Sequence, residues 1–152
     1  MKKILIFFVL ISLVGCGFKV VQDNQFNEYY VAQINTTGDS KINFRIKNKI
    51  LSSSENDNKS PIIINLKTLK QKSIKEKNIK NEVTKYDIKI EVSVEIERIN
   101  SAKINNFQLT KTGSYSVVDR LASTKINENR LIKNLSIDIA EDIKKQLNLI
   151  LK

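Results

Sequence analysis

Tyr86–Glu97, YDIKIEVSVEIE, alternates apolar and polar side chains along its whole length. The apolar residues stand at the even positions from Tyr86 to Ile96, and charged or small polar residues fill the odd positions. Successive side chains of a β-strand point to opposite faces, so a two-residue period gathers all the apolar side chains on one face. The segment therefore predicts a long strand that buries one face against a core and exposes the other to water.

Two more strands are predicted beside this one. After a polar turn at Asn100–Lys103, the positions expected on the apolar side are Phe107, Leu109, Lys111, Gly113, Tyr115 and Val117. So short a connection cannot support a parallel crossover, so these two strands are expected to be antiparallel. Before the long strand, Ser52–Ser60 has the composition of a loop, and Pro61 marks its end. A strand is predicted from Ile62 to about Ser73, followed by a lysine-rich connection.

The segment Glu28–Asn35 predicts a further short strand. Tyr29 and Val31 would share one face of it with Gln33, and Ile34 would lie on the other face. The next residues, Thr36 to Ser40, contain a turn and candidate helix caps.

A first helix is predicted after this turn. Ile42, Ile46 and Ile50 recur every four residues with basic residues between them, which is typical of an amphipathic helix. Phe44 lies off this apolar stripe. Since Ile42, Phe44 and Ile46 also alternate as a strand would, a strand is the alternative interpretation of this segment.

The C-terminal segment predicts a long helix. Asn127 is the expected N-cap, and Glu128 suits the positive N-terminal end of a helix. The apolar stripe is Ile132, Leu135, Ile139, Ile143, Leu147 and Ile150. The predicted order is β-α-β-β-β-α, an α+β fold with a four-stranded, mostly antiparallel sheet and two helices packed on one face.

The N-terminal residues have the layout of a secretory signal. Lys2 and Lys3 precede an apolar run that ends at Leu13, which is shorter than the roughly 20 residues that a transmembrane helix needs. Leu13-Val14-Gly15-Cys16 resembles a bacterial lipobox, in which the cysteine is acylated and becomes the first residue of the mature chain. An ordinary signal peptide with a chance cysteine is the alternative.

These features predict three parts of the chain. Residues 1–15 form a lipoprotein signal peptide, residues 16–27 a lipidated tether, and residues 28–152 a single α+β domain. Cys16 is the lone cysteine, so after its acylation no thiol is left for a disulfide. The covalent lipid would anchor the domain to a membrane outside the cytoplasm.

The chain is strongly basic. Without Lys2 and Lys3 its net charge is near +8, which favours anionic partners such as acidic or phosphorylated lipids. Export makes nucleic acid an unsuitable partner. The alternative is compositional, because 22 Lys, 23 Ile and 17 Asn against 4 Arg are typical of an AT-rich genome.

The sequence offers little for catalysis. It has no histidine, its cysteine is assigned to lipid, and Gly17, Gly38 and Gly113 form no phosphate-binding loop. Glu91, Glu95 and Glu97 share one strand face, where solvation is the ordinary role of alternating charges. We therefore expect no enzyme, no metal site and no cofactor apart from the covalent lipid.

A lysine cluster is the remaining candidate site. Its members are Lys67, Lys70, Lys72, Lys75, Lys77, Lys80 and Lys85, with only Glu76 and Glu82 among them. Lysine binds phosphate as a point charge, and Ile74 and Ile79 could contact acyl chains, so the cluster predicts a glycolipid-binding surface. The alternatives are a solvated strand end and lysines that prevent edge-to-edge aggregation.

The order of these motifs resembles the LptE family, the lipopolysaccharide-assembly lipoproteins of the outer membrane. The resemblance covers the mature chain from Cys16-Gly17-Phe18 through TTGDSKINFRIKNKIL and GSYSVVDRLAS to RLIKNLSIDIAEDIKKQL. Relatives often carry proline or leucine soon after the cysteine, where this chain has Lys19-Val20-Val21.

The resemblance implies a non-enzymatic outer-membrane lipoprotein on the periplasmic side. Family members plug and help to assemble the LptD-type β-barrel translocon and bind lipopolysaccharide during its transport. No motif carries the family's ligand contacts to residues of this chain. The alternative function is a structural lipoprotein accessory of another envelope machine, such as outer-membrane barrel assembly, without a ligand of its own.

Overall fold

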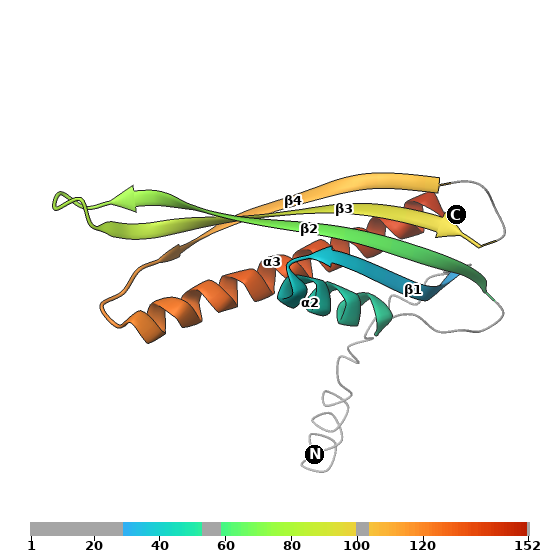
Figure 1. Ribbon diagram of the computed structural model, residues 1–152, viewed down its shortest axis with the longest axis horizontal. Coiled ribbons are helices and arrows are strands. Elements are labelled where there is room, and N and C mark those ends of the chain that lie inside the picture. The colour runs from blue at the N-terminus through green and yellow to red at the C-terminus, as the bar shows by residue number, and fades with distance from the viewer. Residues whose placement is uncertain (1–28, 53–58, 100–103, 152) are drawn as a thin grey trace, which may run out of the picture.

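The computed structural model describes residues 29–52, 59–99 and 104–151, and these residues form four strands and two helices. The elements are β1 (Tyr29–Gly38), α2 (Ser40–Leu51), β2 (Ser60–Lys77), β3 (Val83–Arg98), β4 (Ile104–Ser116) and α3 (Leu121–Ile150). Both helices cover the same face of the sheet, and the opposite face is open (Figure 1). The predicted α+β class and the β-α-β-β-β-α order are confirmed.

The sheet keeps its strands in chain order, β1-β2-β3-β4. β1 and β2 are parallel and are joined through α2, which supplies the crossover that a parallel pair requires. The β2–β3 and β3–β4 pairs are antiparallel, and the short connection between β3 and β4 predicted the second of these pairings. None of the described helices has the length and apolarity needed to cross a bilayer.

The core lies between the helices and the face of β2 and β3 that carries their even-numbered residues. The predicted alternation of β3 is confirmed, since Ile88, Ile90 and Ile96 are completely buried. Other buried core residues are Ile42, Ile46, Ile50, Ile62, Ile64, Leu66, Val92, Val94, Ile139, Ile143 and Leu147. These residues confirm the predicted apolar stripes of both helices, and α2 is a helix rather than a strand.

The predicted faces of β1 need one correction. The pairing register with β2 shifts between Val31 and Gln33, so Ile34 is buried together with Tyr29 and Val31 instead of lying on the other face. A bulge inserts one residue and thereby reverses the alternation that follows it. Gln33 is exposed. The bulge thus buries an isoleucine side chain that strict alternation would have left in water.

Asp39 caps the first helix. Its Oδ1 accepts hydrogen bonds of 3.1 Å from the backbone N–H groups of Lys41 and Ile42, which have no partner within the helix. The cap lies within the stretch that was predicted to hold it. β1 continues to Gly38, however, so Thr36 and Thr37 belong to a strand and not to a turn.

The predicted lysine-rich connection between Ser73 and Tyr86 is wrong. β2 continues to Lys77, and β3 begins at Val83 after a tight turn. The Asn78 side chain accepts hydrogen bonds from the backbone N–H groups of Lys80 and Glu82, and Asn81 adopts φ 64°. Pairing along a hairpin satisfies backbone groups regardless of side-chain polarity, which explains why the strand persists beyond the apolar pattern.

The second helix begins at Leu121, so the predicted N-cap at Asn127 is wrong. Arg120 occupies the N-cap position without a side-chain cap bond. Instead, the Thr124 hydroxyl bonds to both the backbone N–H and the carbonyl of Val118, each at 3.0 Å. This contact ties the loop after β4 to the first turn of α3, before the apolar stripe begins.

We predict that Gly38→Ala destabilises the fold by about 2 kcal/mol or more, because Gly38 has φ +97° and a Cβ there would lie 1.9 Å from the Thr68 carbonyl oxygen. Gly113→Ala is the matched control. Its Cβ would meet the movable end of the Leu131 side chain at 2.7 Å, so the loss should be smaller. Denaturant unfolding of both variants checks this order, and equal losses would contradict it.

Candidate functional site

The seven lysines of the predicted cluster do not form one patch. Side chains at even positions of β2 point toward the helices and those at odd positions point away, because the strand alternates. Lys70 and Lys72 lie on the helix side, Lys67 and Lys75 on the open side, and Lys80 in the hairpin turn.

Lys70 stabilises the junction between β1 and α2. Its Nζ lies 2.7 Å from Asp39 Oδ2, while the other oxygen of that carboxylate caps α2. Burial acts to raise the pKa of Asp39, but the Lys70 ammonium and the backbone N–H bonds outweigh it and hold that pKa below its usual value. The ion pair thus keeps the capping group charged.

Lys72 lies in a small inner cluster of polar and aromatic groups. Its Nζ is 4.1 Å from the centroid of the Tyr86 ring and 3.3 Å from Glu128 Oε2. The Tyr86 and Tyr115 rings stack with centroids 5.7 Å apart, and the Tyr115 hydroxyl donates to the same Glu128 oxygen at 3.1 Å. One carboxylate of α3 therefore joins residues of β2 and β4, while Tyr86 of β3 lies beneath the ammonium.

Charge in this cluster is mutually stabilised. The Tyr115 hydroxyl and the Glu128 carboxylate raise the pKa of Lys72 against the opposing effect of burial. Burial acts to raise the pKa of Glu128, but Lys125 and Lys72 reverse this and lower it below its usual value. Lys72 is thus engaged in contacts within the protein, although its side chain remains 40% exposed.

The distal hairpin carries four of the seven lysines, of which Lys75, Lys77 and Lys80 are exposed and Lys85 is half-buried. Lys75 pairs with Asp87 at 3.2 Å and Lys85 with Glu76 at 2.9 Å. Lys77 donates only to the Asn81 amide, at 2.8 Å, among its contacts within the described chain. The two aliphatic side chains predicted to lie beside the lysines are exposed: Ile74 by about half and Ile79 completely.

The hairpin projects at the same end of the molecule as the first turns of α3 (Figure 1). Between them lies a depression of about 370 Å³, whose walls include Lys72, Val83, Val118, Leu121 and Lys125. Val118 and Leu121 are exposed apolar residues. This hairpin end, comprising residues 74–83 and the walls of the depression, combines ammonium groups with open apolar surface.

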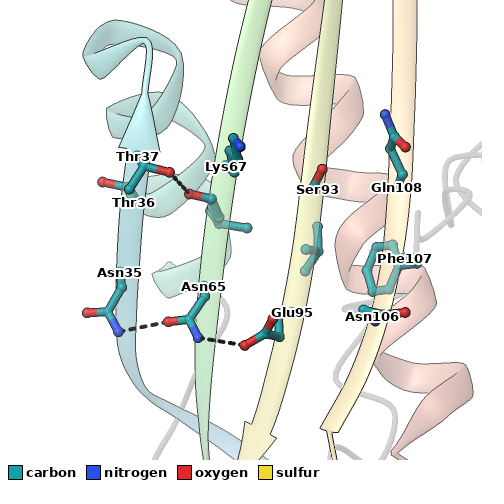
Figure 2. A pocket seen from close by; sticks show the side chains of 12 residues that line it. Asn35, Thr36, Thr37, Asn65, Lys67, Ser93, Glu95, Asn106, Phe107 and Gln108 are labelled. Carbon is teal, nitrogen blue, oxygen red and sulfur yellow. Dashed lines mark hydrogen bonds between the residues drawn. The ribbon is translucent and has the colours of Figure 1, made fainter.

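A second, larger depression of about 650 Å³ crosses the middle of the four strands on the open face. Figure 2 shows Lys67, Ser93 and Gln108 side by side across β2, β3 and β4. The register pairs Lys67 with Ser93 and Ser93 with Gln108, which explains the row. Lys67 is thus separated from the other lysines and lies among uncharged polar groups.

An amide ladder forms the neighbouring row of this depression (Figure 2). The Asn35 amide donates to Asn65 at 2.8 Å, and the Asn65 amide donates to Glu97 at 2.8 Å and to Glu95 at 3.3 Å. The ladder links β1, β2 and β3 by side chains, in addition to the backbone. It stabilises the parallel pairing of an edge strand.

Sequence reasoning missed both the inner cluster and the ladder. The alternation places Tyr86 and Tyr115 on the apolar faces of their strands, but the stacking of their rings depends on the register between β3 and β4. Glu128 was assigned to a helix end, although it lies in the third turn of α3. Cys16, the predicted lipid attachment site, lies outside the described residues. Across residues 29–52, 59–99 and 104–151, no three acidic side chains gather as a metal site.

We predict that Glu128→Gln lowers the free energy of unfolding by about 1 kcal/mol at pH 7, the scale of a partly exposed charged contact. The folded-state pKa of Glu128 is lowered, so its contribution is present above the unfolded pKa near 4.5 and is lost as pH falls through the folded value. The variant should therefore lose less stability between pH 5 and pH 3 than the parent.

The control is Glu76→Gln, which removes an exposed partner of Lys85 and should leave stability nearly unchanged. Thermal unfolding between pH 3 and pH 7 gives the stability of the parent and of both variants. Parallel pH profiles for the parent and Glu128→Gln would show that the inner cluster contributes nothing to stability.

No protein-family model matches the chain, and no curated protein matches its sequence. Solved structures do match its fold. Rare lipoprotein B from Shewanella oneidensis superposes with a TM-score of 0.59 at 12% identity and covers 78% of this chain and 95% of its own.

Two other lipoproteins superpose in the same way. Lipoprotein B from Nitrosomonas europaea has a TM-score of 0.53 at 17% identity, covering 82% of this chain and 85% of its own. A minor lipoprotein from Acinetobacter baumannii has a TM-score of 0.54 at 15% identity, covering 78% of this chain and 94% of its own. The chain therefore shares the fold of these three lipoproteins over most of its described length.

Proposed function

We propose that the protein is an outer-membrane lipoprotein, acylated at Cys16 and located on the periplasmic side, that binds lipopolysaccharide or a related phosphorylated glycolipid. In this proposal it plugs an LptD-type β-barrel translocon and helps that barrel to assemble. It acts by binding, not by catalysis. The lipobox motif and the fold shared with three lipoproteins support the anchoring part of the proposal.

The glycolipid part of the proposal rests on the composition of the hairpin end. It presents Ile79 and Ile74 to solvent among lysines, and the adjoining depression adds Val118 and Leu121. A phosphorylated glycolipid has anionic phosphates beside acyl chains. Ammonium groups next to open apolar surface match that chemistry, because phosphate gains Coulomb energy and the chains leave water.

Within the hairpin end, the most available cations are Lys77 and Lys80. Lys77 contacts an uncharged amide, and Lys80 lies in the turn with no carboxylate within ion-pair distance in the described chain. Lys70, Lys75 and Lys85 already pair with Asp39, Asp87 and Glu76. Within the hairpin end, the tip is thus where added phosphate displaces the fewest internal contacts.

These same ion pairs favour the second candidate function. If most of the lysines exist to balance acidic side chains and to protect the unpaired edge of β2, the protein is a structural accessory of another envelope complex without a ligand. β1 pairs with β2 only as far as Thr68, so the distal part of β2 does have an open edge. Glycolipid binding separates the two candidates.

We predict that Lys77→Glu/Lys80→Glu weakens glycolipid binding by about tenfold or more, since two attractive charges become repulsive. The measurement is the rise in melting temperature of the protein titrated with purified lipopolysaccharide and with lipid A. Lys133→Glu is the control, because it reverses one exposed lysine on α3 away from the hairpin. Unchanged binding in the double variant, or equal loss in the control, would remove the hairpin from the proposal.

We further predict that the tagged, lipidated protein recovers a large β-barrel in stoichiometric amount when it is purified from detergent-solubilised membranes. Mass spectrometry would identify the barrel and show the acyl groups on Cys16. Recovery of a translocon barrel supports the plug function. Recovery with a different envelope complex would favour the accessory function, and an unmodified Cys16 would contradict both.

A further inference from the structure

The outward side of α2 carries exposed apolar and basic side chains that have no role in the proposed function. Phe44 is 65% exposed and Leu51 is 38% exposed, although both lie on a helix that buries another apolar stripe in the core. Lys41, Arg45 and Lys47 surround them. We call these five residues the outer face of α2.

Helical spacing makes this a continuous surface. Phe44 and Leu51 are seven residues apart, so they lie almost one above the other along the helix. The core stripe of Ile42, Ile46 and Ile50 points to the opposite side, and all three residues are buried. Lys41 and Arg45 flank the outward apolar pair on one side, and Lys47 flanks it on the other.

The charge on this helix has one sign. α2 contains no acidic residue, and the N-cap carboxylate of Asp39 is already paired with Lys70. Lys49 is paired with Glu141 of α3 at 2.9 Å. Within the described residues no carboxylate lies within ion-pair distance of Lys41, Arg45 or Lys47. Among the described residues, the outer face is therefore a cationic surface without acidic partners around an exposed aromatic ring.

Cations around exposed aromatic and aliphatic side chains are the composition of helices that lie in a membrane interface. The chain length also fits, because Tyr29 follows Cys16 by 13 residues, which span at most about 45 Å. A lipid at Cys16 would therefore hold the start of β1 within about 45 Å of the bilayer, which allows the adjacent helix to reach its surface.

We propose that the outer face of α2 docks on the anionic headgroups of the membrane that holds the lipid anchor, with Phe44 and Leu51 entering the interface. This inference rests on the acylation of Cys16 in the proposed function, and it does not require the glycolipid contacts of the hairpin. Docking would orient the tethered domain and limit the directions in which the hairpin end can point.

The chain lacks tryptophan, which permits a direct test. Phe44→Trp is prepared in the full-length lipidated protein and reconstituted in vesicles of phosphatidylcholine alone or with phosphatidylglycerol, both with brominated acyl chains and without glycolipid. We expect quenched, blue-shifted fluorescence in the anionic vesicles. Adding Lys41→Glu/Arg45→Glu/Lys47→Glu should shift the docking equilibrium by on the order of 100-fold toward the undocked state.

The control is Leu149→Trp, which places a single tryptophan at a residue that is 67% exposed on α3. It should remain unquenched in both kinds of vesicle. Equal quenching of both tryptophans, an unquenched Trp at position 44 in anionic vesicles, or no effect of the charge reversals would overturn the inference. Circular dichroism and melting confirm the fold of each variant, and mass spectrometry of Cys16 separates failure of anchoring from failure of docking.

Discussion

The structure depends on the burial of one face of β3. This strand lies inside the sheet, paired with β2 on one side and β4 on the other, and its isoleucines are completely removed from water. Each buried isoleucine contributes roughly 1.5–3 kcal/mol, so the helices must remain on this face for the sheet to persist. Gly113 of β4 allows α3 to approach closely, because any side chain there would meet Leu131. The open face is therefore free to carry polar groups, and it does so in the Asn35–Asn65–Glu95 ladder.

Electrostatics divides the many lysines into two groups. Some are part of the architecture: Lys70 supports the cap of α2, Lys72 joins the inner cluster, and Lys111 pairs with Asp142 of α3 at 2.6 Å. Others have no acidic partner in the described chain, at the tip of the hairpin and on the outer face of α2. A basic composition alone cannot separate these groups. Which lysines remain available to the proposed glycolipid and bilayer depends on which carboxylates the fold brings within reach.

The fold class could be predicted from the sequence because its strongest signals are local periodicities that match the final burial. The alternation from Tyr86 to Ile96 and the four-residue spacing of Ile42, Ile46 and Ile50 both describe one buried face. Errors occurred where tertiary contacts override the local pattern. The bulge before Ile34 depends on pairing with β2, which lies about 30 residues further along the chain. The extension of β2 to Lys77 depends on hairpin pairing with β3, and the early start of α3 at Leu121 depends on the contact between Thr124 and Val118, neither of which the apolar pattern contains.

The sequence by itself determined the order of elements, the core stripes and the resemblance of Leu13–Cys16 to a lipobox, because each depends on residues close together along the chain. Only the tertiary structure decided which lysines face outward, since alternation, pairing register and distant carboxylates together place each ammonium group. It separated Lys67 from Lys77 and Lys80, and it exposed Phe44 beside Lys41 and Arg45. A cluster in sequence becomes a site only when the strands carry its members to the same face, and a strand sends its neighbouring residues to opposite faces.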